Sequence, residues 1–173
     1  MTKQELANKI ASQLHEDWRK TRLREDGTYE PRWKATKSAN FDANLDRDNL
    51  PTYIRVNEDG SVEIDIANCS YENLSPAWQA ENKAAAEVVA DILAREAHGE
   101  RFSLDEVGAI IHDQWLLRND WAKGGDLDKP FADLPKVEQD KDLDQYRIGL
   151  EELGAEKIVD EPVKTINPDG EGK

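Results

Sequence analysis

Histidine is scarce in this chain of 173 residues, and two of its three copies stand in the same setting. His15 is followed by two acidic residues and Trp18, and His112 is followed by Asp113 and, two residues later, Trp115. An imidazole beside a carboxylate can bind a metal ion or move a proton. The two histidines are therefore the first candidates for chemistry, and the elements around them decide between catalysis and packing.

The adjacent pair His112-Asp113 supports one catalytic alternative. Such a pair on a helix is typical of metal-dependent HD-type phosphohydrolases, and His98 or His15 would then have to supply a second imidazole. That site also needs an aspartate on a later helix. In addition, the bulky Trp115 follows the His112-Asp113 pair closely here. We interpret both histidines as structural, because ring N–H groups that fix a tryptophan and a loop would explain the duplication. We therefore predict no catalytic residue, no metal ligand and no cofactor.

A second signature accompanies each histidine unit. An aromatic residue is followed three positions later by a leucine and then by a proline, once at Tyr71 to Leu74 and once at Phe131 to Leu134. Aligned on the leucines, the two stretches continue without a gap, so that Gln79 falls on Gln139 and Asn82 on Asp142. Self-similarity of this kind indicates a duplicated scaffold. The pattern assigns structural roles to four residues: His15, His112, Leu74 and Leu134.

Apolar periodicity predicts four main helices that must position these units. The first begins at a capping box of Thr2 and Glu5 and should end around residues 24–26, before Gly27. The others should run from Pro76 to about residue 97, from Ser103 to before residue 123, and from Pro135 to Gly154. Their expected inward faces are Leu6, Ile10, Leu14 and Trp18; Trp78, Ala85, Val88, Val89, Ile92 and Leu93; Val107, Ile110, Ile111, Trp115 and Leu116; and Val137, Leu143, Tyr146, Leu150 and Leu153.

Between the first two helices the period of the sequence changes. Residues 52–66 alternate between apolar and polar side chains around a turn that contains Gly60, which predicts an inserted β-hairpin. Residues 27–50 are expected to form an irregular but mostly ordered loop. The fold class is therefore mainly α with a minor β part: two pseudo-repeated pairs of helices about a pseudo-twofold axis, plus the hairpin.

Composition limits the partners. The formal net charge is −14, and 38% of the residues are hydrophobic, which predicts a soluble, acidic, cytoplasmic protein that does not bind duplex nucleic acid. No apolar stretch is long enough for a membrane helix, and the single cysteine, Cys69, excludes an internal disulfide. Residues 1–37 carry nine Lys and Arg against six Asp and Glu, so one surface is compatible with anions.

This basic segment also contains aromatic residues. Arginine and lysine interleaved with tryptophan and tyrosine can stack a planar group and bind a phosphate or carboxylate. The second half repeats this composition around Trp115, and packing of the two halves would place both sets in one groove, where small molecules often bind. The candidate ligand-binding residues are Trp18, Arg22, Tyr29, Trp33, Trp115 and Arg118. The alternative is that these side chains only neutralise and pack against the rest of the chain.

The duplicated units resemble the ryanodine-receptor (RyR) domain, a small repeat found in pairs in calcium-release channels and in short bacterial proteins. The resemblance covers about half of the chain and is strongest over residues 111–115, 131–138 and 150–154. The second unit departs from the family, because it lacks the tyrosine after its glycines and a His-Pro before Phe131. The resemblance implies a first unit over 1–99 that includes the hairpin, a second unit over 100–160, and a disordered acidic tail over 161–173.

For function, the resemblance implies a non-catalytic module for interaction or ligand sensing. We predict that it binds an acidic peptide or a phosphorylated small molecule in the groove between the two units. The alternatives are the HD-type phosphohydrolase and an acidic, phage-derived accessory protein that blocks a basic surface of another protein. A hairpin with a free edge could also pair across a twofold axis to give a dimer.

Overall fold

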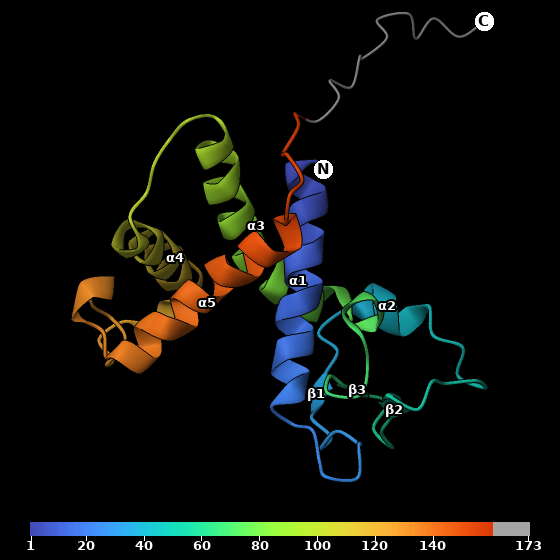
Figure 1. Ribbon diagram of the computed structural model, residues 1–173. Coiled ribbons are helices and arrows are strands. Elements are labelled where there is room, and N and C mark those ends of the chain that lie inside the picture. The colour runs from blue at the N-terminus through green and yellow to red at the C-terminus, as the bar shows by residue number, and fades with distance from the viewer. Residues whose placement is uncertain (161–173) are drawn as a thin grey trace, which may run out of the picture.

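The computed structural model describes residues 1–160, so the predicted tail at 161–173 lies outside the described residues. The fold is mainly helical with a small antiparallel sheet (Figure 1). The long helices are α1 (Lys3–Lys20), α3 (Pro76–Ala97), α4 (Leu104–Arg118) and α5 (Lys136–Leu153). These four helices confirm the predicted number of main helices. No helix in the described part of the chain is long and apolar enough to cross a membrane.

The first helix begins as predicted and ends earlier. The Thr2 hydroxyl accepts a hydrogen bond from the Glu5 N–H, and the Glu5 carboxylate accepts one from the Thr2 N–H, which forms the capping box. The helix ends at Lys20 rather than near residues 24–26. Beyond it the Thr21 hydroxyl donates to the Trp18 carbonyl, and the chain turns through Gly27 at φ +83°. A polar side chain that bonds the backbone locally competes with helix continuation.

The sheet contains the predicted hairpin and one additional strand. Strands β2 (Ile54–Val56) and β3 (Val62–Asp65) pair in antiparallel fashion around a turn with Gly60 at φ +85°. Strand β1 (Trp33–Ala35) pairs with the other edge of β3, which gives the order β1-β3-β2. The short helix α2 (Ala39–Ala43) follows β1. The expectation of an irregular loop over 27–50 is therefore wrong at β1, which pairs with β3, and at α2, whereas the rest of this segment is irregular as expected.

One apolar core joins all four long helices. It combines side chains from residues 1–99 with side chains from residues 100–160, and α5 crosses both α1 and α3 (Figure 1). Gly149 allows this crossing, because a Cβ at that position would lie 2.5 Å from Val89 Cγ1 and 3.0 Å from Leu93 Cδ1. The buried members are Leu6, Ala7, Ile10, Ala11, Ala86, Val89, Ala90, Ile92, Leu93, Val107, Ile111 and Ile148.

Helix α5 presents the predicted face to this core only in part: Leu143, Tyr146 and Leu153 pack against it as expected. Val137 and Leu150 were expected to point inward, but they are 63% and 46% exposed. The buried positions are instead Asp142, Ile148 and Gly149. Close approach at Gly149 fixes the rotation of the helix about its axis. Because of this contact, which involves a residue without a side chain, Val137 and Leu150 point outward although the apolar pattern predicts them inward.

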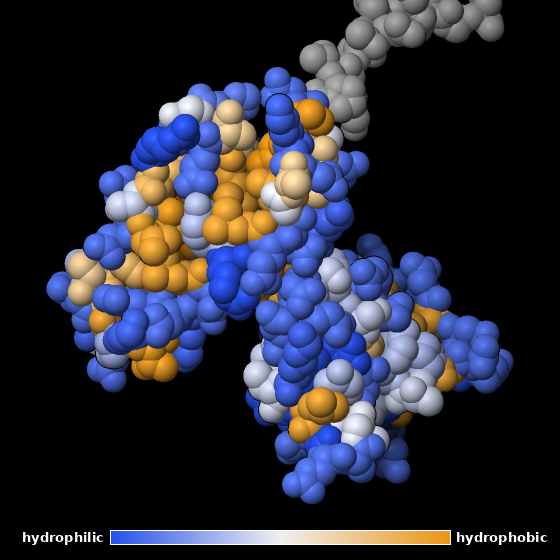
Figure 2. All heavy atoms as spheres, viewed as in Figure 1, coloured by the Kyte–Doolittle hydropathy of each residue, from blue (hydrophilic) through white to orange (hydrophobic). Residues whose placement is uncertain are grey.

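A second apolar cluster lies under the sheet. It contains Ile54, Val62 and Ile64, and Trp18 of α1 and Trp78 of α3 pack against it. The sheet and α2 form a separate lobe at the lower right of Figure 1, and α1 runs between this lobe and the helical part. Figure 2 shows that polar side chains cover most of this lobe in that view. The lobe therefore depends on α1 and α3 to cover its inner face.

Candidate functional site

Each of the two histidines lies against the tryptophan of its own unit. The rings of His15 and Trp18 stack with centroids 5.8 Å apart, and those of His112 and Trp115 stack at 5.9 Å. The Nε2–H of His15 donates to the Cys69 carbonyl at 2.9 Å. Burial lowers the pKa of His15, which favours the neutral ring.

The second histidine binds its loop in the same way. His112 Nε2 lies 3.0 Å from the Leu127 carbonyl and 2.9 Å from the Lys129 carbonyl, so this nitrogen carries a hydrogen that both oxygens accept. Its Nδ1 lies 3.5 Å from Asp142 Oδ2. The protein's own atoms thus surround both ring nitrogens. Among residues 1–160, no group of three or more His, Cys, Asp or Glu side chains is arranged to bind a metal ion.

Two matching turns face the histidines. Tyr71–Asn73 and Phe131–Asp133 each form one turn of 3₁₀ helix, and a buried leucine, Leu74 or Leu134, follows each turn. The side-chain amide of Gln79 donates to the Tyr71 carbonyl at 3.0 Å, and that of Gln139 donates to the Phe131 carbonyl at 3.0 Å. The same local contacts therefore occur twice, at residues that align in the sequence.

A cavity of about 410 Å³ lies beside the first histidine, and we call it the Trp18 pocket. Helix α1 contributes Trp18, helix α3 contributes Trp78, and the segment at β1 contributes Arg32 and Lys34. The full lining is His15, Trp18, Arg32, Lys34, Ile66, Leu74, Trp78, Glu81 and Asn82. Two indole rings and two cationic side chains thus share one cavity with a single carboxylate.

Short polar contacts position these groups. The Trp78 indole N–H donates to the Ala35 carbonyl at 2.9 Å, which fixes that ring against β1. The carboxylate of buried Asp65 accepts the Arg32 backbone N–H at 2.8 Å and fixes the start of the strand. Neither Arg32 nor Lys34 forms an ion pair within the described residues. Both cations therefore remain available to a ligand.

A second cavity, of about 310 Å³, lies beside His112, and we call it the Trp115 pocket. It lies between α4, α5 and the turn that ends at Leu134. Its lining is His112, Trp115, Leu127, Leu134, Glu138, Lys141, Asp142 and Gln145. Burial raises the pKa of Asp142 to about 6, although the His112 ring opposes this shift. The two pockets thus share their histidine, tryptophan and leucine walls but differ in charge.

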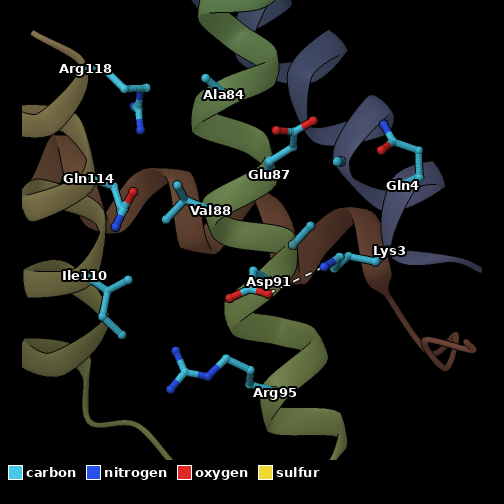
Figure 3. A pocket seen from close by; sticks show the side chains of 12 residues that line it. Lys3, Gln4, Ala84, Glu87, Val88, Asp91, Arg95, Ile110, Gln114 and Arg118 are labelled. Carbon is cyan, nitrogen blue, oxygen red and sulfur yellow. Dashed lines mark ion pairs between the residues drawn. The ribbon is translucent and has the colours of Figure 1, made fainter.

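A cavity of about 630 Å³ forms a groove lined by α3, α4 and the first residues of α1 (Figure 3). Side chains of α3 and α4, among them Val88, Ile110 and Gln114, point toward one another across it (Figure 3). Arg118 lies at one end, and burial lowers the pKa of its guanidinium. No aromatic side chain lines this groove.

The structure therefore distributes the six predicted ligand-binding residues over several places. Trp18, Trp115 and Arg118 line three different cavities. The other three make contacts within the protein. Arg22 lies over the Trp18 ring at 5.7 Å and donates to the Glu30 carbonyl; Arg19 covers Tyr29 at 4.5 Å, and Arg55 covers Trp33 at 4.3 Å.

Sequence reasoning missed three residues as site residues: Arg32, Lys34 and Trp78. Trp78 was expected in the core, and the two cations were noted only as part of a basic cluster. The sequence did contain a signal for the two cations. Arg32 and Lys34 are separated by Trp33, and in an extended segment such alternate residues lie on the same face. Cys69 is buried, and burial raises the pKa of its thiol to about 12, so it remains protonated.

A scan against family models finds no matching family for this sequence, and searches of curated proteins and of solved structures also find no match.

Proposed function

We propose that this protein is a non-catalytic binding module that takes up a planar, anionic small molecule in the Trp18 pocket. The observation behind this proposal is the meeting of Trp18, Trp78, Arg32 and Lys34 around one cavity. Indole rings stack planar groups, and arginine and lysine bind phosphate or carboxylate oxygens. A phosphorylated aromatic compound, such as a nucleotide, combines both features.

The geometry agrees with this ligand class in size and in charge. A cavity of about 410 Å³ is within the range of small-molecule sites, and its exposed surface is mostly apolar. Glu81 is the only acidic residue of the lining. A ligand with its charge at one end and an aromatic ring at the other would place the charge near Arg32 and Lys34 and the ring near the two indoles.

We further propose that the two histidine units are related repeats of the RyR-domain type. Support comes from the matched stacking of His15 on Trp18 and of His112 on Trp115. The glutamine contacts to the two aromatic turns add to it. In this interpretation the histidines are structural, and the difference in function lies in the residues that line each pocket.

The ligand proposal is tested by calorimetric titration with adenosine 5′-monophosphate, with adenosine as the uncharged comparison. Binding of the monophosphate should weaken by about tenfold or more in the double variant Arg32→Ala/Lys34→Ala, because two charge-assisted contacts are lost. It should also weaken as salt is added. The matched control is Lys9→Ala/Arg24→Ala, which removes the same charge outside the pocket.

Three outcomes would contradict the proposal. One is the absence of binding by either compound, and another is equal binding of adenosine and its monophosphate. The third is an equal loss of affinity in both double variants, which would indicate a general field of positive charge rather than a pocket. Far-UV circular dichroism of each variant establishes that the fold is retained.

A further inference from the structure

The Trp115 pocket combines three features that the proposed function does not use. Trp115 supplies an aromatic wall, which the His112 ring holds by stacking and which the Trp121 ring contacts edge-on at 5.6 Å. Asp142 and Glu138 lie four residues apart on α5, so both carboxylates are on the same side of the helix. An indole wall opposite two carboxylates is the composition that binds organic cations.

Asp142 is the central group of this pocket. It is only 9% exposed, and its one recorded polar contact within the described residues is His112 Nδ1 at 3.5 Å, longer than a good hydrogen bond. The carboxylate therefore lies almost entirely inside the protein, at the wall of a cavity, without a strong partner. A buried carboxylate in that position gains more from a cationic ligand than an exposed one does.

The remaining charges of the pocket allow a cation to enter. Lys141 pairs with Glu138 at 3.0 Å, but the Lys141 side chain is 65% exposed and can move into solvent. Exposed ion pairs of this kind contribute little free energy, so a ligand can replace Lys141 at Glu138 at low cost. Residues 100–160 contain sixteen Asp and Glu against eight Lys and Arg, which attracts cations to this half of the molecule.

In the Trp18 pocket an uncharged residue stands at the position that corresponds to Asp142. Asn82 lines that pocket beside His15, as Asp142 lines the second pocket beside His112. An amide can donate a hydrogen to an imidazole nitrogen, whereas an ionised carboxylate cannot. The residue beside the histidine is therefore neutral in the first pocket, whereas in the second it is an acceptor that a donor from outside can satisfy.

We propose that the Trp115 pocket is a second, independent ligand site that binds an alkylguanidinium group. Guanidinium is planar, so it can stack on the Trp115 indole, and its fork of N–H donors can reach Asp142 and Glu138 together. A cavity of about 310 Å³ accommodates this headgroup and a short alkyl chain. The Trp115 pocket thus binds a cation, whereas the Trp18 pocket is proposed to bind an anion. The first of these proposals does not depend on the second.

The test is calorimetric titration of the full chain with agmatine, with an arginine-containing tripeptide blocked at both ends, and with a neutral alkylurea of the same shape. Both guanidinium compounds should bind, whereas the urea should not. Tighter binding of agmatine would indicate a free small molecule, and tighter binding of the tripeptide would indicate an arginine side chain of a partner protein. Either result supports the guanidinium site.

Variants locate the binding. Asp142→Asn should weaken guanidinium binding by about tenfold or more, and Trp115→Leu should also weaken it. Asp144→Asn removes the same charge from an exposed position of α5 and should leave the affinity unchanged. Arg32→Ala/Lys34→Ala should also leave it unchanged, which separates this site from the Trp18 pocket.

The proposal is overturned by the absence of heat with both guanidinium compounds, or by equal binding of the urea. It is also overturned if Asp142→Asn binds as the wild type does, or if Asp144→Asn weakens binding equally. Asp142→Asn has a precedent for folding in Asn82 beside His15, and circular dichroism checks it. If Asp142→Asn does not fold, the Trp115→Leu and Asp144→Asn comparison decides the question.

Discussion

The two stacked histidines differ in the polar side chain that lines the pocket beside each of them. Asn82 lines the pocket of His15, whereas Asp142 lines that of His112. The Nε2 of His112 donates to two carbonyls, and its Nδ1 lies 3.5 Å from Asp142 Oδ2. A protonated Asp142 is therefore tolerated beside this ring, and the relevant proton is the one on the Asp142 carboxyl group.

That proton makes the stability of the fold depend on pH. Burial raises the pKa of Asp142 from 3.8 to about 6, so the folded state binds the proton more tightly than the unfolded state. The contribution of a protonated Asp142 is fully present below about pH 4 and is lost as the pH rises to about 6. The titratable groups that face Asp142 are His112 of α4 and Glu138 and Lys141 of α5.

We predict that Asp142→Asn becomes more stable relative to wild type as the pH rises from about 4 to about 6. The gain should be on the order of 1–3 kcal/mol in the free energy of unfolding and constant above this range. Urea denaturation at several pH values measures it. Asp144→Asn, at an exposed position of the same helix, serves as the control. A stability difference for Asp142→Asn that is independent of pH would contradict the prediction.

At the scale of elements, the rotation of α5 depends on a residue without a side chain. A Gly-to-Ala exchange inside an exposed helix normally stabilises a protein by about 0.5–1 kcal/mol. At Gly149 the new Cβ would overlap Val89 and approach Leu93 and Ile10, in the middle of the shared core. The steric cost therefore exceeds the gain in helix propensity.

Gly149→Ala should consequently destabilise the protein by about 1–3 kcal/mol, a typical cost of overpacking a core. Val137→Ala is the matched control on the same helix, because Val137 is exposed and its truncation should change stability by about 0.5 kcal/mol or less. Urea unfolding followed by circular dichroism compares the two. Unchanged or increased stability of Gly149→Ala would show that α5 can shift away from α3.

The elements also show what a sequence reveals and what it does not. The capping signals at Thr2 and Ser103 predict helix starts correctly, because the hydroxyl of each accepts a hydrogen bond from the N–H three residues later. The hairpin is equally local. Strand β1 was missed because its partner β3 begins almost thirty residues later, and three residues give too little periodicity to recognise. Part of the buried face of α5, at Ile148 and Gly149, was missed because a contact with the distant residue Val89 determines it.

The same distinction applies to the site. The sequence pairs each histidine with its tryptophan, and the structure brings both pairs into contact. The expected gathering of Trp18 and Trp115 in one groove required knowledge of how the units are arranged. In the structure these tryptophans line separate cavities, and the groove between the units contains arginines and apolar residues instead.

For the whole molecule, the shared core predicts cooperative unfolding. Side chains of both units form one cluster, and Tyr71 packs against this cluster as well as against the one under the sheet. A small protein with such a connected interior usually unfolds in one step. Tryptophan fluorescence and far-UV circular dichroism should therefore give the same urea midpoint, and Gly149→Ala should lower both equally. Separate midpoints would indicate that the sheet lobe unfolds independently.

The buried Cys69 thiol has a consequence for the kinetics of this molecule. It lies in the cluster under the sheet, and its own carbonyl accepts the hydrogen bond from His15. A thiol that is inaccessible and protonated reacts with an alkylating reagent only during moments of exposure. The rate of alkylation thus reports how often the contact between His15 and this segment opens. A ligand bound in the adjacent Trp18 pocket would lower the rate of alkylation.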